Sequence, residues 1–73
     1  MTALELHDLA AAHTDEHHAV TYRFGADGYR FRLESHVGRR AVEFVLPAER
    51  VGFMVREEMD RLFRRALRRA DAA

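Results

Sequence analysis

Five arginines near the C-terminus are the residues of this 73-residue chain with the clearest capacity for binding chemistry. They recur at a spacing that places side chains on one face of a helix. We call them the C-terminal arginine row, which consists of Arg61, Arg64, Arg65, Arg68 and Arg69. Guanidinium groups in such a row can bind phosphates or an acidic protein surface. The alternative is a solvated helix end, where arginines suit the helix dipole and pair with Glu57, Glu58 and Asp60.

A second group consists of Arg23, Arg30 and Arg32, which we call the outer arginine patch because alternation puts all three on the outer face of a predicted sheet. In the predicted pairing Arg23 stands directly opposite Arg32, and Glu34 stands opposite Glu43. Like charges in opposed positions destabilise a sheet unless an opposite charge lies between them. The patch is therefore either a site for an anion or an acidic partner, or a solvated face balanced by diagonal neighbours.

The histidines are a third candidate. His13 and His17 have the i, i+4 spacing of helical metal ligands, but the predicted helix ends between them and no cysteine assists. The pattern favours a polar loop that gains charge at mildly acidic pH. His18 and Ser35 are predicted to point inward as diagonal neighbours, without a third group to orient them as a catalytic pair. We therefore assign no catalytic residue, metal or cofactor, and expect that the chain is not an enzyme.

The elements that position these residues follow from capping and periodicity. Thr2 and Glu5 have capping-box spacing, and the apolar stripe that follows predicts a helix from Ala3 to about His13. Apolar residues then alternate with polar ones, which predicts three strands ending at Leu46. Asp27-Gly28 is the predicted two-residue turn of the first hairpin, and Gly38-Arg39 that of the second.

These two turns set the predicted register of the sheet. Phe24 then faces Phe31 across the first hairpin, while Leu33 faces Phe44 and Phe31 faces Leu46 across the second. Both turns place the large apolar side chains on a single face. The sequence therefore predicts an antiparallel three-stranded meander that is apolar on one side.

One long helix is predicted from Pro47 to about Ala70, since proline suits the first helical turn and apolar residues then recur with helical period. Its length of roughly 36 Å exceeds the span of the strands, roughly 20–25 Å. We therefore expect part of its apolar stripe to overhang the sheet. The predicted dimer interface on this stripe consists of Met59, Leu62, Phe63, Ala66 and Leu67.

Composition sets the limits of these predictions. The net charge of zero hides a polarised chain: residues 1–18 hold four acids and no arginine, and residues 61–73 hold five arginines and one acid. The absence of cysteine favours a reducing compartment, and we expect a cytoplasmic protein. No apolar run reaches about eighteen residues, so no membrane span is predicted. An all-arginine, lysine-free composition indicates a GC-rich bacterial or phage genome.

The predicted fold is α+β in the order α-β-β-β-α, with residues 1–73 forming one domain and both helices packed on one face of the sheet. In element order it resembles double-stranded-RNA-binding domains and small dimeric secretion chaperones of bacteria. The former carry a lysine cluster where this chain has Pro47-Ala48-Glu49-Arg50, so no residue is carried over. We expect a non-enzymatic protein–protein interaction module, an adaptor or inhibitor that homodimerises through its last helix. The alternative is nucleic-acid binding through the C-terminal arginine row.

Overall fold

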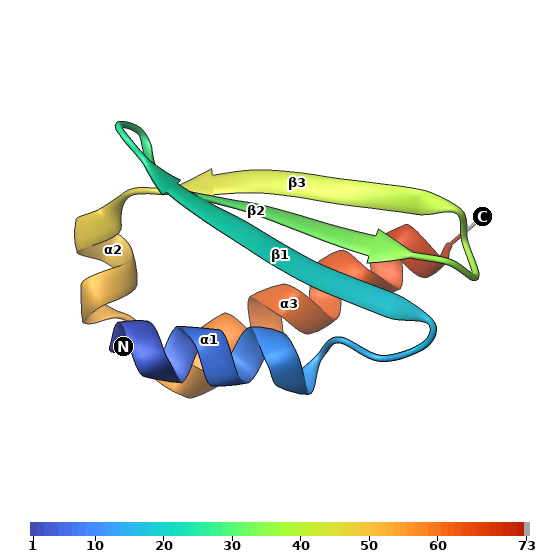
Figure 1. The fold of residues 1–73 in the computed structure, drawn as a ribbon, viewed down its shortest axis with the longest axis horizontal. Coiled ribbons are helices and arrows are strands. Elements are labelled where there is room, and N and C mark those ends of the chain that lie inside the picture. The colour runs from blue at the N-terminus through green and yellow to red at the C-terminus, as the bar shows by residue number, and fades with distance from the viewer. Residues whose placement is uncertain (73) are drawn as a thin grey trace.

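A computed structural model describes residues 1–72, so Ala73 of the predicted domain lies outside the described part. Three strands form one antiparallel sheet in the order β1-β2-β3, and the helices lie on one side of it (Figure 1). The elements are α1 (Ala3–Ala12), β1 (His18–Gly25), β2 (Gly28–Ser35), β3 (Arg40–Leu46), α2 (Ala48–Phe53) and α3 (Arg56–Asp71). The predicted α+β fold is confirmed, with its last helix divided in two.

Helix α1 begins as its sequence predicts. The Thr2 hydroxyl accepts a hydrogen bond from the backbone N–H of Glu5 at 3.1 Å, and the Glu5 carboxylate accepts one from the N–H of Thr2 at 3.0 Å. This capping box satisfies two amides that the helix itself cannot pair. Leu6 and Leu9 are buried and hold α1 against the sheet.

The turn of the first hairpin lies one residue earlier than predicted, which shifts every cross-strand partner by two residues. Gly25 pairs with Gly28, so Ala26 and Asp27 form the turn, and Phe24 faces Tyr29 instead of Phe31. Gly28 has a φ of 109°, and a Cβ there would overlap the carbonyl oxygen of Leu46. The glycine is therefore needed where β2 passes close to the end of β3, and this contact outweighs the local preference for a turn at Asp27-Gly28.

The second hairpin departs from the prediction in the same way. Residues 36–39 form a four-residue loop, Ser35 pairs with Arg40, and Phe31 faces Phe44 instead of Leu46. The positive φ, 54°, belongs to Arg39, so Gly38 is not the first central residue of a type II′ turn. A Cβ on Gly38 would overlap the carbonyl oxygen of Ala70, which means that this glycine allows α3 to approach the loop.

The prediction of one continuous C-terminal helix is wrong. Met54 and Val55 have extended backbones, with ψ of 145° and 156°, and they separate α2 from α3. The Met1 ammonium donates to the carbonyls of Val51, Gly52 and Met54 at 2.7–3.3 Å, so the end of α2 is satisfied by the other end of the chain. Helix α3 alone is about 24 Å long, close to the about 26 Å of an eight-residue strand. It therefore does not overhang the sheet as predicted.

The apolar stripe of α3 is consequently covered within the chain. Met59 and Phe63 are completely buried, Ala66 and Leu67 are nearly so, and Leu62 is half-buried against the same core. These are the residues predicted as a dimer interface, and the reason for that prediction, an unpartnered stripe, no longer holds. The core that they form with the sheet lies between α3, α1 and the inner face of the strands. Among the described residues, no helix is long and apolar enough to cross a membrane.

Candidate functional site

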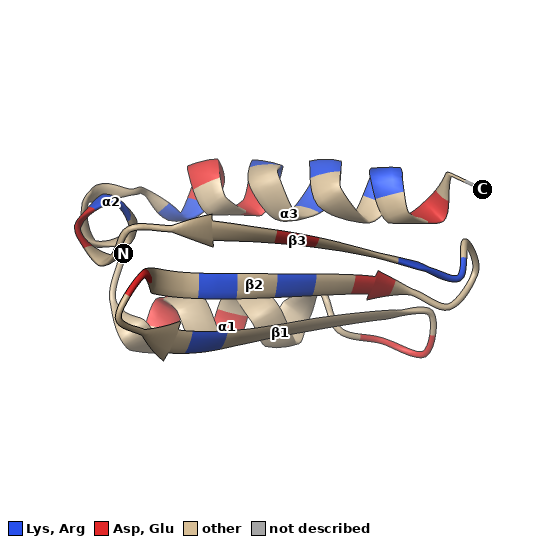
Figure 2. Cartoon of the chain, turned by 90° about the horizontal axis from the view of Figure 1, so that it is seen from above, with Lys and Arg blue, Asp and Glu red and all other residues tan. Residues whose placement is uncertain are grey.

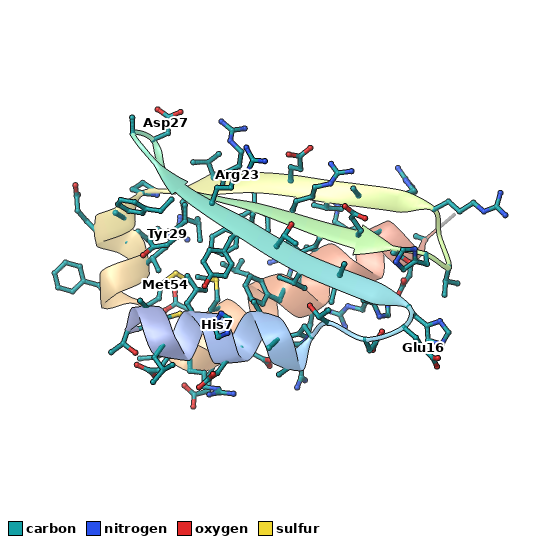
Figure 3. All side chains as sticks on the ribbon, in the orientation of Figure 1. His7, Glu16, Arg23, Asp27, Tyr29 and Met54 are labelled. Atoms are coloured by element: carbon teal, nitrogen blue, oxygen red, sulfur yellow. The ribbon has the colours of Figure 1, made fainter. Side chains whose placement is uncertain are left out.

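The outer face of the sheet is not covered by the helices, and charged side chains gather on it. Figure 2 views the molecule from this side, with two arginine bands on β2, one on β1 and an acidic band on β3. Since alternate residues of a strand point to opposite faces, Arg23, Arg30 and Arg32 lie here while their neighbours Tyr22, Phe31 and Leu33 face the core. Figure 3 shows Arg23 on the side of the sheet away from Tyr29 and Met54. The outer arginine patch is thus exposed on the outer face of a sheet whose inner face packs on the core.

The register decides which charges of the patch meet. Arg32 lies opposite Glu43, and its guanidinium donates to that carboxylate at 3.0 Å and to Glu34 at 2.8 Å. The hydrogen bond and the charge of Glu34 raise the pKa of Arg32 above its usual range, with a smaller contribution from Glu43. Glu34 stands opposite Ala41, so the predicted Glu34–Glu43 opposition is wrong. The predicted opposition of the two glutamates is therefore absent, and Arg32 bridges them instead.

Arg23 and Arg30 form a like-charged pair on this face. They are direct partners in the register, a position predicted for Arg23 and Arg32. Arg30 approaches the carboxylate of Asp27 only at 3.9 Å, and Arg23 forms no ion pair with any of residues 1–72. A shallow depression of about 410 Å³ lies over them and is also lined by Thr21 and Glu43. Two guanidiniums without a full counter-charge around such a depression can bind a carboxylate.

The C-terminal arginine row lies on the surface of α3 opposite its buried stripe, and all five side chains are exposed. Arg64 forms an ion pair with Asp60, with 3.0 Å between Nε and Oδ2. Within residues 1–72 the other four form no ion pair, so the expected pairing with Glu57 and Glu58 is not observed there. Because α3 packs on the inner face of the sheet, its arginines point away from the outer arginine patch. The structure therefore does not bring the two arginine groups together.

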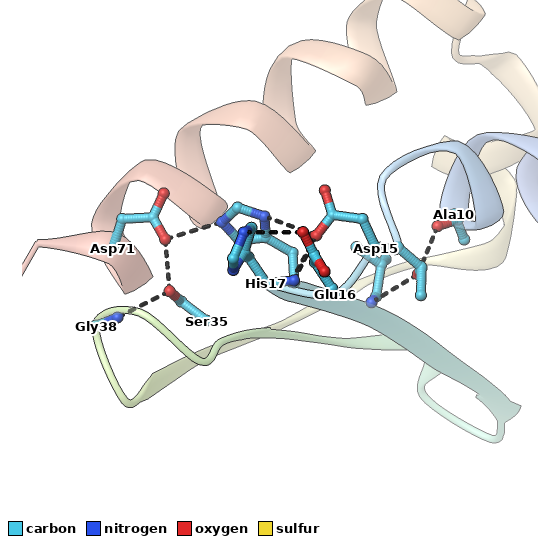
Figure 4. A network of polar contacts seen from close by, with 10 residues as sticks. Ala10, Asp15, Glu16, His17, Ser35, Gly38 and Asp71 are labelled. Atoms are coloured by element: carbon cyan, nitrogen blue, oxygen red, sulfur yellow. Dashed lines mark hydrogen bonds and ion pairs between the residues drawn. The ribbon is translucent and has the colours of Figure 1, made fainter.

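The inward histidine and serine are joined by a carboxylate that the sequence analysis did not assign to them (Figure 4). His18 lies directly opposite Ser35 instead of diagonally, and both bind Oδ1 of Asp71, His18 through Nε2 at 2.9 Å. The Ser35 oxygen also accepts from the N–H of Gly38 at 3.0 Å. The Ser35 hydrogen bond, followed by that of His18, lowers the pKa of Asp71. This geometry clamps the end of α3 to the sheet, because Ser35 and His18 contact Asp71 and not each other.

The loop before β1 is fixed by local hydrogen bonds. The Asp15 carboxylate accepts from the N–H groups of His17 and His18 at 2.7 and 2.9 Å, which lowers the pKa of Asp15. Nε2 of His13 lies 2.7 Å from the carboxylate of Asp60, which joins the end of α1 to α3. Over residues 1–72, no three histidine or carboxylate side chains are grouped as metal ligands. The side chains of His13 and His18 therefore connect elements, through Asp60 and Asp71.

Asp71 and the Arg32–Glu43 pair are the site and support residues that sequence reasoning missed. Asp71 carries a weak signal, since it is the one acid after the C-terminal arginine row. No family model, curated protein or solved structure matches the chain. Its function must therefore be argued from its own residues.

Proposed function

We propose that this chain is a non-enzymatic protein–protein interaction module, an adaptor or inhibitor that binds an acidic surface of a partner protein through the outer arginine patch. The observation that carries the proposal is the direct opposition of Arg23 and Arg30 on an uncovered sheet face. Such a pair costs stability in the isolated chain. A partner carboxylate placed between the two guanidiniums would remove the repulsion and form charge-assisted hydrogen bonds.

The surroundings of the patch favour a protein surface over a phosphate backbone. Glu34 and Glu43 stand beside Arg32 on the same face, and they would repel a continuous run of phosphates across the patch more strongly than a single partner carboxylate placed between Arg23 and Arg30. Exposed Ala41 and Val45 supply apolar contact area on β3. Arginine combined with apolar and polar side chains is typical of the composition of protein interfaces.

The test uses a glutamate-rich peptide as the probe and amide chemical shifts as the readout, at about 0.15 M salt so that distant charges are screened. We expect the shifts to gather on β1 and β2. The double variant Arg23→Glu/Arg30→Glu should lose them. The matched control Arg61→Glu/Arg65→Glu makes the same change of charge on α3 and should keep them. Loss in the control with retention in the first variant would contradict the proposal.

A second candidate function is nucleic-acid binding through the C-terminal arginine row. Its support is that Arg61, Arg65, Arg68 and Arg69 are exposed without ion pairs in the described part of the chain. They span about 12 Å of helix, a length over which duplex DNA carries about seven charges. If four phosphates are neutralised, affinity for a 20-base-pair duplex should fall roughly 100-fold between 50 and 200 mM salt. No gel mobility shift at 50 mM salt would exclude this candidate.

Homodimerisation remains part of the prediction only as self-association through a surface other than the buried stripe of α3. Phe63 and Met59, its central residues, are already fully covered by the chain's own sheet. A monomeric mass by light scattering at all micromolar concentrations would remove it. The cytoplasmic location and the bacterial or phage origin rest on the absence of cysteine and lysine.

A further inference from the structure

Strand β1 is an edge strand, and its first half is already occupied by the chain itself. The backbone N–H of Val20 donates to the hydroxyl of Thr14 at 3.1 Å, and the carbonyl of His18 accepts from the N–H of Asp15 at 2.9 Å. These groups point away from β2, so the loop before the strand protects this part of the edge. Proteins commonly cover sheet edges in this way, because unpaired backbone groups invite another strand.

The second half of the same edge is open. In an antiparallel pair, alternate residues turn both backbone groups to the same side. The backbone N–H and C=O groups of Tyr22 and Phe24 therefore point away from β2, as those of His18 and Val20 do. Over residues 1–72, no side chain or loop hydrogen-bonds to the backbone of Tyr22 or Phe24 on that side. The stretch from Thr21 to Gly25 therefore presents a short row of unpaired donors and acceptors, about 16 Å long.

A groove beside this stretch provides room for side chains. It lies between α1 and β1 and has a volume of about 560 Å³. It runs from Thr14 and Val20 at the occupied half of the edge to Thr21 and Tyr22 at the open half, and α1 contributes His7, Ala10 and Ala11. Figure 3 shows His7 on α1 below the sheet. Phe24, the next residue of β1 on this face, is 67% exposed. The small alanine side chains and the aromatic rings make this side of the edge suitable for apolar residues.

The other side of the same edge carries positive charge. Arg23 lies between Tyr22 and Phe24 and points to the outer face, where it is opposite Arg30. A strand added beside β1 would thus place every second side chain next to the groove and the others next to the outer arginine patch. A second copy of β1 paired antiparallel over Tyr22–Phe24 would place Arg23 against Arg23, which like-charge repulsion disfavours.

We propose that the edge of β1 between Thr21 and Gly25 is a strand-addition site for an extended segment of the partner protein, with alternating apolar and acidic side chains. The backbone groups of Tyr22 and Phe24 pair with the segment, its apolar residues enter the groove, and its acidic residues meet Arg23 and Arg30. This inference rests on the proposed function, since it specifies how the acidic partner is held. Strand addition of this kind derives affinity from the main chain and specificity from alternate side chains.

The experiment uses an acetylated, fluorescent eight-residue peptide of alternating glutamate and valine as the probe. Hydrogen exchange of the unmodified chain is expected to slow at the amides of Tyr22 and Phe24 when the peptide binds. A synthetic chain with an N-methyl group on Phe24 should bind roughly tenfold more weakly, because a donor is lost and a methyl group blocks the edge. The matched control carries an N-methyl group on Val45, at the outward edge of β3, and should bind within about twofold of the unmodified chain. Circular dichroism checks that both synthetic chains are folded.

The outcomes separate this inference from the proposed function. If the peptide binds without slowing exchange at Tyr22 and Phe24, and Arg23→Glu/Arg30→Glu abolishes its binding, strand addition is wrong and binding to the patch stands. If neither the N-methyl group on Phe24 nor the substitution Arg23→Glu/Arg30→Glu weakens peptide binding, both proposals are wrong. Slowed exchange that grows with protein concentration without peptide would identify a second copy as the occupant and overturn the inference. Absence of any peptide binding also overturns it, while the glutamate-rich titration still judges the proposed function.

Discussion

The inner and outer faces of the same three strands follow different physical rules. On the inner face Phe31 and Leu33 are completely buried among the helices, and apolar burial holds them there. On the outer face Arg23 and Arg30 oppose each other in water, where repulsion is weakened but not relieved. One face therefore stabilises the fold, whereas the other carries a local cost that binding to an acidic partner would remove. Four variants test it, each through a change in the stability of the chain.

The largest effect is expected on the inner face. Phe63→Ala removes a fully buried ring that contacts Phe31 edge to face at a centroid distance of 5.5 Å. We expect a loss of about 3–5 kcal/mol, which would unfold much of so small a protein. Urea unfolding measures it. Phe53→Ala is the matched control: this ring is 91% exposed, and its loss should change stability by less than about 0.5 kcal/mol. Equal losses for the two variants would contradict the assignment of the core.

A smaller effect is expected where the inner face meets the end of α3. Gly38→Ala places a Cβ against the carbonyl oxygen of Ala70, and backbone must move to admit it. We expect destabilisation of about 1–3 kcal/mol, as for overpacked sites. Gly52→Ala is the control, because no atom lies within 4 Å of its Cβ and α2 gains a better helix former. It should leave stability unchanged or raise it by up to about 1 kcal/mol. Thermal unfolding should therefore occur at a lower temperature for Gly38→Ala, and at an unchanged or higher temperature for Gly52→Ala.

The Asp71 clamp should stabilise the wild-type chain at neutral pH and lose this contribution only in acid. The pKa of Asp71 is lower when folded than its ordinary value of 3.8, chiefly through the Ser35 hydrogen bond. Its contribution is therefore complete above about pH 4 and is lost as the pH falls through the folded pKa. Asp71→Asn should reduce stability at pH 7 and flatten its dependence on pH below 4. A variant whose acid unfolding profile matches that of the wild type would show that the clamp does not contribute.

The smallest effect, of opposite sign, is expected on the outer face. Arg23→Thr removes the repulsion with Arg30 and introduces a β-branched residue, so it should stabilise the chain by about 0.5 kcal/mol at low salt. The gain should shrink at about 1 M salt, where charges are screened within about 3 Å. Arg65→Thr on α3 is the control and should destabilise slightly, because threonine is a poorer helix former than arginine. A destabilised Arg23→Thr chain would mean that the arginine pair carries no cost.

The accuracy of the sequence-based predictions differs between these regions for physical reasons. The start of α1 was predicted because the capping box involves only Thr2 and its near neighbour Glu5. The break at Met54-Val55 was missed, since helical periodicity continues across it and the carbonyls of α2 are satisfied by Met1, about fifty residues away in sequence. Likewise, Asp71 joins His18 and Ser35 only because α3 ends beside them. Contacts distant in sequence leave little trace in local patterns.

The sequence by itself determined which face of the sheet each side chain occupies, because alternation along a strand has a period of two. The predicted cross-strand partners were wrong by two residues in both hairpins. An even shift leaves the inner face apolar and the outer face charged. It changes every cross-strand partner, however. Only the tertiary structure decided that Arg23 meets Arg30 and that Glu43 neutralises Arg32, because close backbone contacts at Gly28 and Gly38 set the register. Those contacts depend on β3 and α3, which local turn preferences do not include.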